Sequence, residues 1–142
     1  MTAELKIGID IVDVREVEHA LASFGARYTE RVFTPAEVAY ASNAADPTVT
    51  ARRLGARFAA KEATLKALNA SERGISPRSI EVSRRSNGAI ALDLSGPAFA
   101  AAQEAGAVEL AVSISHESHW AIAVVIARGR VDMPRSRIWW KR

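Results

Sequence analysis

The segment that most constrains the fold is residues 50–69, TARRLGARFAAKEATLKALN, which has helical periodicity but no polar side. At about 100° per residue, the side opposite its bulky residues consists of glycine and alanine. A helix that is apolar or small nearly all round is buried, with close neighbours on its small side. The segment therefore predicts a long buried central helix, whose bulky stripe is formed by Leu54, Phe58, Leu65 and Leu68.

The charged residues of this segment are harder to explain. Arg53, Arg57 and Lys61 recur every four residues and form one ridge, and Glu62 and Lys66 are spaced as a pair on the other flank. Isolated charges are expensive to bury, so these groups must be paired, reach solvent or face an ionic ligand. One interpretation is an internal ladder of ion pairs. The other is an external anion such as a phosphate ligand, because these four bases accompany a single acid.

Asp10 is the second anomaly. It stands in the middle of residues 6–14, KIGIDIVDV, whose Ile and Val content predicts a strand, and Gly8 lies on the same face. An ionised carboxylate in such a strand needs either an arginine partner or a metal ion. His116, at the end of another apolar strand pattern, is either a hydrogen-bonded turn residue or a functional group.

Cap and turn residues predict the remaining elements. The run from Thr34 to Glu37 has the residues of a capping box with proline at the first helical position, and Asn87-Gly88 marks a tight hairpin turn. Because hairpin strands pair antiparallel, the expected fold class is α+β. The expected helices are 15–24, 35–42, 50–69 and 97–105, and the expected strands are 6–14, 79–85, 89–94, 109–116 and 119–127.

The chain has 142 residues, a length that favours one domain with its own core. It has no cysteine, which excludes disulfides, thiol nucleophiles and cysteine-ligated metals. No basic leader with an apolar core precedes the first strand, and no apolar run approaches the roughly 20 residues of a membrane span. We therefore expect a cytoplasmic protein with no membrane partner.

Charge divides the chain into a body at residues 1–127 and a basic tail at residues 128–142. The tail has six basic residues and one acid, whereas the whole chain carries a net charge of only +3, so the body is slightly acidic. This distribution weakens any argument for a nucleic-acid partner from overall charge. Trp139 and Trp140 in the tail favour packing against another surface.

Five short motifs, taken together, resemble those of the holo-[acyl-carrier-protein] synthases, the small type of 4′-phosphopantetheinyl transferase. The match extends over residues 6–127 in order and spacing, and its most specific part is RFAAKEA followed by KAL. The motifs are GIDIV at 8–12, FTPAE at 33–37, RFAAKEA at 57–63, KAL at 66–68 and SISHE at 113–117.

The resemblance implies a 4′-phosphopantetheinyl transferase-like fold, an antiparallel sheet with the long buried helix at its centre. It implies an enzyme that uses Mg²⁺ to transfer the 4′-phosphopantetheine moiety of coenzyme A to a serine of apo acyl carrier protein. The other product is adenosine 3′,5′-bisphosphate. Such enzymes generally form a homotrimer with active sites at subunit interfaces, and we expect this one to serve fatty acid biosynthesis.

The resemblance also assigns roles to residues. Asp10 and Glu62 are expected to hold the metal and, with Lys66, to carry catalysis. The serine must lose a proton, and the base is a metal-bound water, Glu62 or Asp10. The residues expected to bind coenzyme A are Arg53, Arg57, Lys61, Lys66, Ser115 and His116. The residues expected to dock the acidic carrier protein are Arg15, Arg27 and Arg31.

Two alternatives remain open at this point. The first is a transferase dedicated to polyketide or peptide-synthase carriers, which differs only in docking. The second is a non-catalytic nucleotide- or nucleic-acid-binding module that uses Arg52, Arg53, Arg57 and the tail. Such a module has no use for Asp10 and Glu62, because acids repel phosphate unless a cation intervenes.

Overall fold

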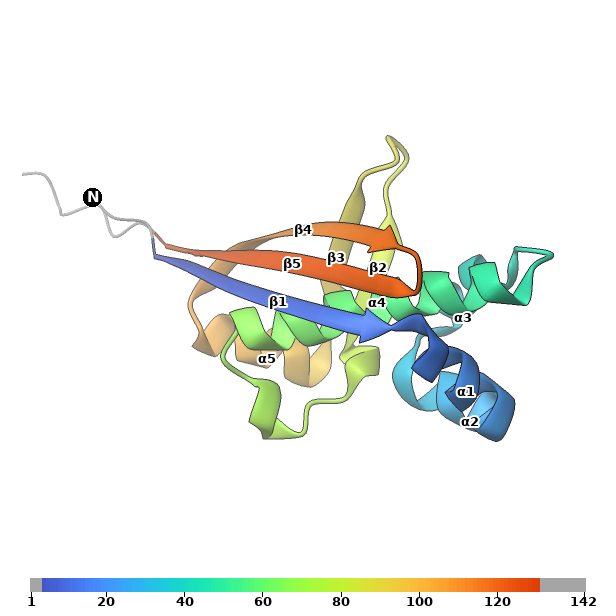
Figure 1. The fold of residues 1–142 in the computed structure, drawn as a ribbon. Helices are drawn as coiled ribbons and strands as arrows, with labels where there is room; N and C mark the ends of the chain where they lie inside the picture. The colour runs from blue at the N-terminus through green and yellow to red at the C-terminus, as the bar shows by residue number, and fades with distance from the viewer. Residues whose placement is uncertain (1–3, 131–142) are drawn as a thin grey trace, which may run out of the picture.

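The computed structural model describes residues 4–130, in which one strand is followed by four helices, a two-stranded hairpin, a fifth helix and a second pair of strands (Figure 1). Short 3₁₀ turns at Ser71–Arg73 and Pro77–Ser79 connect the central helix to the first hairpin. The elements are β1 (Leu5–Asp13), α1 (Val14–Phe24), α2 (Ala26–Val32), α3 (Pro35–Ser42), α4 (Pro47–Ala67), β2 (Ile80–Arg84), β3 (Ile90–Leu94), α5 (Gly96–Glu104), β4 (Ala107–Glu117) and β5 (Trp120–Gly129).

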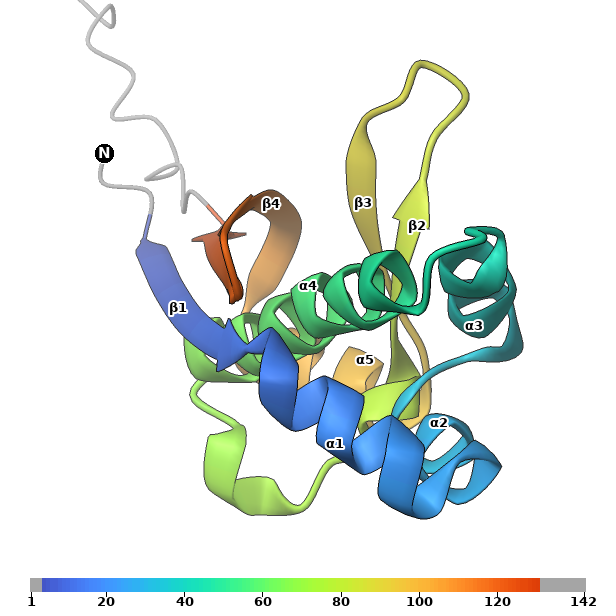
Figure 2. The same cartoon turned by 45° about the vertical axis from the view of Figure 1, so that its right-hand side comes forward.

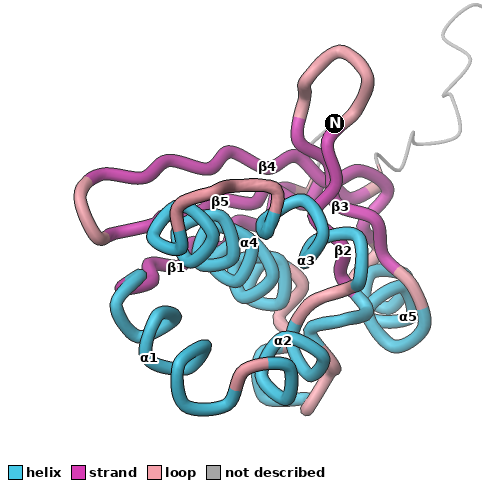
Figure 3. Tube along the Cα trace, turned by 90° about the vertical axis from the view of Figure 1, so that its right-hand side faces the viewer, coloured by secondary structure: helices cyan, strands magenta, loops and turns pink. Residues whose placement is uncertain are grey.

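The strands form two antiparallel sheets, a three-stranded sheet in the order β1-β5-β4 and the separate hairpin β2-β3. Helix α4 packs against the inner face of the larger sheet, chiefly against β1 and β5. Figure 2 shows α4 running beneath that sheet with the β2-β3 hairpin rising beside it, and Figure 3 shows α4 end-on between the sheet and α1. The expected α+β class, antiparallel pairing and central buried helix are confirmed.

The small side of α4 allows the close packing that its sequence predicts. Gly8 of β1 lies directly against the α4 backbone, where a Cβ would overlap the Ala63 carbonyl oxygen and lie 2.6 Å from the Ala67 amide nitrogen. Gly55 of α4 faces Val14 of α1 at ordinary contact distance. Strand β1 and helix α4 therefore approach closely because Gly8 has no side chain at the point where it meets the α4 backbone.

Helix capping sets the boundaries of α3 and α4. The capping box is confirmed, since the Glu37 amide donates to the Thr34 hydroxyl and the Thr34 amide donates to the Glu37 carboxylate. Helix α4 begins at Pro47, earlier than predicted, because the Asp46 side chain accepts from the Thr48 amide and proline occupies the first turn. This Asp-Pro signal lies between the two helices expected at 35–42 and 50–69.

Helix α2 was not predicted. Its seven residues, ARYTERV, follow Gly25, whose positive φ of 52° ends α1 and turns the chain. A single buried residue, Val32, anchors it, so the segment has too little apolar periodicity to be recognised. Most of the tail predicted at 128–142, including Trp139 and Trp140, lies outside the described residues.

Substitution of Gly8 tests the close packing of β1 on α4. We expect Gly8→Ala to lower the free energy of unfolding by about 3 kcal/mol or more, because the added methyl group meets helix backbone that cannot yield. Gly55→Ala is the matched control, since its Cβ would lie 3.4 Å from the nearest Val14 carbon. That change should gain up to about 1 kcal/mol of helix propensity. Equal urea midpoints for the two variants would contradict the prediction.

Candidate active site

An acidic cluster lies where β1 crosses α4. Asp10, on the inner face of β1, accepts a hydrogen bond of 2.8 Å from the Lys66 ammonium, which also donates to the Ile9 carbonyl oxygen. Glu62, one helical turn before Lys66, is half-buried beside them. The structure thus brings together Asp10, Glu62 and Lys66, as the motifs predicted.

The electrostatics of Glu62 distinguish it from an ordinary surface carboxylate. Burial raises its pKa first, and the negative charge of Asp10 raises it further, against a smaller lowering by Lys66. The carboxylates of Asp10 and Glu62 therefore lie close together, and the Lys66 ammonium is the positive charge that they share. A divalent cation would remove the repulsion between the acids, so their arrangement fits a metal ion.

The donor set of this cluster indicates which kind of cation it suits. Within residues 4–130, no group of three or more His, Cys, Asp or Glu side chains is placed to enclose a metal. Two carboxylates at one edge match Mg²⁺, which commonly takes one or two protein carboxylates and completes its octahedron with water and substrate phosphate. Asp10 and Glu62 thus fit an ion shared with a phosphate ligand.

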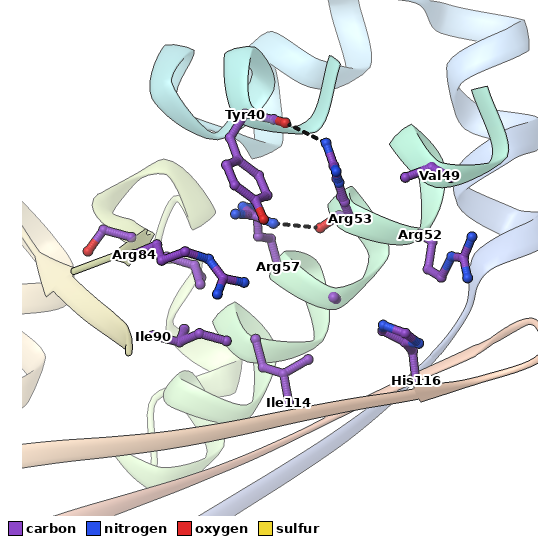
Figure 4. A pocket seen from close by; sticks show the side chains of 12 residues that line it. Tyr40, Val49, Arg52, Arg53, Arg57, Arg84, Ile90, Ile114 and His116 are labelled. Carbon is purple, nitrogen blue, oxygen red and sulfur yellow. Dashed lines mark hydrogen bonds between the residues drawn. The ribbon is translucent and has the colours of Figure 1, made fainter. Parts of the chain in front are cut away.

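A basic pocket of about 400 Å³ lies on another side of α4 (Figure 4). Glu62 is about two and a half helical turns from Arg53, so the two side chains leave α4 on opposite sides. Helix α4, the hairpin strand β2, helix α3 and the end of β4 all contribute to the pocket wall. Its polar lining residues are Tyr40, Arg52, Arg53, Arg57, Ser83, Arg84 and His116.

Arg57 forms the buried wall of this pocket. Its side chain is only 8% exposed, and its Nη1 donates to the Arg53 carbonyl oxygen. Its Nε is buried without a hydrogen-bond partner among the described residues. Desolvation lowers the pKa of the Arg57 guanidinium, while the charge of Glu37 opposes that effect. A buried donor without an acceptor is rare in folded proteins, so Arg57 has hydrogen-bonding capacity for an anion.

Lys61 occupies a different environment from the one expected. Its ammonium is fully buried, lies 2.7 Å from the Glu37 carboxylate and donates to the carbonyl oxygens of Pro77 and Ile80. All three hydrogens of the ammonium therefore have acceptors inside the protein. The structure places Lys61 in the core and not at the basic pocket, which corrects the expectation that it faces coenzyme phosphates.

Glu37 was interpreted as a capping residue alone, but it also holds the core together. Its carboxylate receives the Val82 amide at 2.8 Å, in addition to Lys61 and the Thr34 amide. One acid from α3 thereby joins α4 and β2. Because Glu37 lies on another helix, counting only the acid within α4 overestimates the unbalanced positive charge of that helix.

Ser115 and His116 point to opposite faces of β4. His116 lines the basic pocket together with Ile114, whereas Ser115 pairs with Ile122 of β5 on the outer face of the sheet. Within one chain the structure therefore brings His116 to the pocket and leaves Ser115 away from it. Because side chains alternate along a strand, the SISHE sequence alone predicts that Ser115 and His116 point to opposite faces.

The three arginines expected to dock a carrier are all exposed. Arg15 is held by Asp13, the N-cap of α1, through hydrogen bonds that include one of 2.6 Å to Oδ2. This contact lowers the pKa of Asp13 to about 2. Arg27 and Arg31 lie on α2, the helix that the sequence did not predict, and their docking role stays a prediction.

Two residues of the basic pocket were not predicted from the sequence. Tyr40 lies on α3 and Arg84 at the end of β2, and neither belongs to a motif quoted for the resemblance. Tyr40 lies three residues after Glu37 on α3, and Arg84 is the last residue of β2, just before the hairpin turn. Neither position suggests a ligand site until the fold places both beside Arg57.

Comparison with known proteins agrees with this geometry. A family profile described as the 4′-phosphopantetheinyl transferase superfamily matches residues 6–125. The holo-[acyl-carrier-protein] synthase of Desulfovibrio desulfuricans is 40% identical over 121 residues, 84% of this chain and 94% of the relative. The chain therefore belongs to the 4′-phosphopantetheinyl transferase superfamily.

Within that superfamily, the solved structures that it resembles are holo-acyl-carrier-protein synthases. The crystal structure from Plasmodium yoelii has a TM-score of 0.80 and 28% identity, with 92% of this chain and 100% of that chain covered. The Chronobacterium ammoniagenes complex with coenzyme A has a TM-score of 0.76 and 31% identity, with 90% and 99% covered. The resemblance found from the motifs is confirmed.

Replacement of Lys61 distinguishes a structural role from a ligand-binding role. We expect Lys61→Met to lower the free energy of unfolding by about 3–5 kcal/mol, because the Glu37 carboxylate is left buried without its counter-charge. Thermal denaturation monitored by circular dichroism measures the change. Lys66→Met is the matched control, since Lys66 is exposed and its loss should shift stability much less. A Lys61 variant of unchanged stability with weakened coenzyme binding would contradict this assignment.

Proposed function

We infer that the chain is a holo-[acyl-carrier-protein] synthase, which transfers the 4′-phosphopantetheine moiety of coenzyme A to a serine of apo acyl carrier protein. The observation that carries this conclusion is the convergence of Asp10, Glu62 and Lys66 where β1 crosses α4. The named relatives, one of them in complex with coenzyme A, support the same reaction.

The reaction balances without any further reactant. The serine oxygen attacks the phosphorus that bears pantetheine, and the pyrophosphate bond to the nucleotide half breaks. Adenosine 3′,5′-bisphosphate leaves, and the serine proton passes to a base. Asp10 and Glu62 would hold Mg²⁺, which when bound supplies charge neutralisation for the pyrophosphate.

The chain's own residues account for the remaining requirements of phosphoryl transfer, which are positioning and charge stabilisation. Lys66 already lies 2.8 Å from Asp10, so its ammonium can neutralise a phosphate oxygen that approaches the acidic cluster. Arg57 and His116 supply cationic and hydrogen-bonding groups for the phosphates of the coenzyme. Glu62, with its raised pKa, is a candidate acceptor for the serine proton.

A homotrimer with sites at its subunit interfaces is part of the proposal. The outer face of the larger sheet exposes an apolar row on β1, in which Ile7 is 69%, Ile9 59% and Ile11 57% exposed. Each of these pairs with an apolar residue of β5 on the same face. An apolar surface of this kind indicates an interface with another protein. A second copy placed on this face would also cover Ser115, so that Ser115 could contact coenzyme A bound to the neighbouring subunit.

Disruption of the outer sheet face tests the assembly. We expect the wild-type chain to have three times the mass of one chain by light scattering and Ile9→Glu to have a smaller mass, because a charge cannot be buried at an apolar interface. Arg31→Glu, on exposed α2, is the control and should keep the larger mass. A wild-type monomer at micromolar concentration would refute the trimer.

The choice of carrier and the cellular setting complete the proposal. Arg15, Arg27 and Arg31 offer a basic docking surface for an acidic carrier protein, and fatty acid biosynthesis is the pathway proposed. Polyketide and peptide-synthase carriers are the alternative acceptors. No helix in residues 4–130 has the length and apolar character to cross a membrane, and we place the enzyme in the cytoplasm. A nucleic-acid-binding module remains disfavoured, because it gives Asp10 and Glu62 no role.

Mass spectrometry of apo acyl carrier protein, incubated with coenzyme A and Mg²⁺, tests the reaction directly. We expect the carrier to gain one phosphopantetheine, and EDTA to prevent that gain. Glu62→Gln should abolish transfer and leave the melting temperature at or above that of the wild type, because burial disfavours the charged form of this carboxyl.

Apo carriers of the fatty-acid, polyketide and peptide-synthase types, assayed side by side, identify the acceptor. Modification of the fatty-acid carrier at the highest kcat/KM supports the proposed pathway. Wild-type turnover by the Glu62 variant would refute its catalytic role, and transfer that persists in EDTA would refute the metal requirement.

A further inference from the structure

A second hollow, of about 320 Å³, lies between β3, α5 and the start of β4 and shares no lining residue with the basic pocket. Its lining residues are apolar except for Asp93 and Glu109. Two of the apolar ones, Phe99 on α5 and Val108 on β4, are 51% and 48% exposed. We call this hollow the α5 groove. Apolar side chains gathered in an open groove indicate a binding site for another polypeptide segment.

The α5 groove lies at the joint between the two sheets. Strand β3 belongs to the hairpin and β4 is the outer strand of the larger sheet, so each has an edge that no neighbouring strand pairs with among residues 4–130. The two strands pack against each other, and α5 packs against β4. A segment bound in the groove therefore contacts both sheets and α5 together.

The described part of the tail ends at the rim of the α5 groove. Gly129 pairs with Ala107, which lines the groove. Figure 1 shows the end of β5, the start of β4 and α5 at the same end of the molecule. Trp139 follows Arg130 by nine residues, which span at most about 30 Å. Trp139 and its neighbour Trp140 are therefore within reach of every residue that lines the groove.

The remainder of the tail has chemistry that matches the α5 groove. Residues 138–140, Ile-Trp-Trp, form an apolar run with basic residues on both sides. The groove is likewise apolar with exposed acids, and residues 86–127 contain no lysine or arginine. The side chains of Asp93 and Glu109 are 42% and 61% exposed and each makes one salt bridge with a surface arginine, so their oxygens can accept further hydrogen bonds. Apolar packing and charge therefore favour the same pairing of tail and groove.

Tethering favours the protein's own tail over a separate partner. A segment joined to its site by a short linker has an effective concentration in the millimolar range, about a thousandfold above that of a micromolar protein. Tryptophan also buries a large apolar area with few side-chain torsions to fix. The tail therefore has the advantage over a second copy of the chain in reaching the groove.

We propose that residues 138–140 bind in the α5 groove of the same chain, with the tryptophan rings on Phe99 and Val108 and the flanking bases beside Asp93 and Glu109. The bound tail closes the joint between the hairpin and the larger sheet. This inference goes beyond the proposed function and does not depend on the transfer reaction.

Tryptophan fluorescence of the full-length chain tests the proposal. The chain has three tryptophans, so Trp120→Phe leaves only Trp139 and Trp140 to report. We expect acrylamide to quench this variant about threefold less than the same variant unfolded in urea, because packed indole rings are shielded from solvent. Equal quenching of the native and unfolded chains would overturn the proposal.

Two phenylalanines provide a matched comparison in the Trp120→Phe background. Phe99→Ser removes an aromatic surface from the groove and should raise the quenching constant to that of the unfolded chain. Phe24→Ser, on α1, is the control and should leave quenching unchanged, because Phe24 is also exposed, at 57%, and does not line the groove. Equal effects of the two substitutions, with native circular dichroism for both, mean that the tail binds elsewhere.

Disulfide cross-linking identifies the chain whose groove is occupied, and it decides the point if Phe99→Ser unfolds. The chain has no cysteine, so Gln103→Cys and Ser136→Cys create a single pair of thiols. Gln103 is exposed on α5 one turn after Phe99, and Ser136 lies two residues before Ile138. Under oxidation we expect a monomer that migrates faster on a non-reducing gel.

The control for cross-linking is Ser23→Cys with Ser136→Cys, because Ser23 is exposed on α1, away from the groove. This variant should retain its free thiols. Covalent dimers of the Gln103 variant would show that a second copy occupies the groove, and free thiols in it would show that the tail is not bound there. Either result refutes the binding of the tail in its own groove.

Discussion

Contact between two backbones, β1 and α4, is the constraint on which the rest of the structure depends. Gly8 lies against the α4 backbone at Ala63 and Ala67 with no room for a side chain. Two residues further along the same face, Asp10 reaches Lys66 and influences Glu62. A side chain at position 8 would separate strand from helix and take Asp10 away from its partners. The stability of the core and the composition of the acidic cluster therefore share one cause.

The distribution of acids decides which charges of α4 are available to a ligand. Glu37 of α3 neutralises Lys61 inside the core, and Asp10 of β1 neutralises Lys66 at its edge. Within residues 4–130, Arg53 and Arg57 have no salt-bridge partner, and they lie around Tyr40 with Arg84. A helix with one apparent excess of positive charge thus contains a core lysine, a lysine at the acidic cluster and a pair of arginines at the basic pocket.

Local rules predicted the elements that local interactions determine. The long helix, the Thr34–Glu37 cap and the hairpin at Asn87-Gly88 all follow from side-chain size, capping chemistry and turn preference. Prediction failed where the decisive partner is distant in sequence. Helix α2 has one buried residue and depends on its neighbours, and Lys61 was assigned to a ligand because its acid lies on another helix. The pairing of Asp10 with Glu62 was found only through the motifs, which record a tertiary contact.

The sequence by itself determined the α+β class and the buried central helix, because periodicity and residue size are properties of neighbouring residues. It also determined the family, through motifs that resemble those of known members. Only the tertiary structure decided that Lys61 is a core group, that Ser115 faces outward, and that Tyr40 and Arg84 join the basic pocket. The physical reason is that burial and charge compensation depend on which side chains meet across elements, and a one-dimensional pattern does not contain those distances.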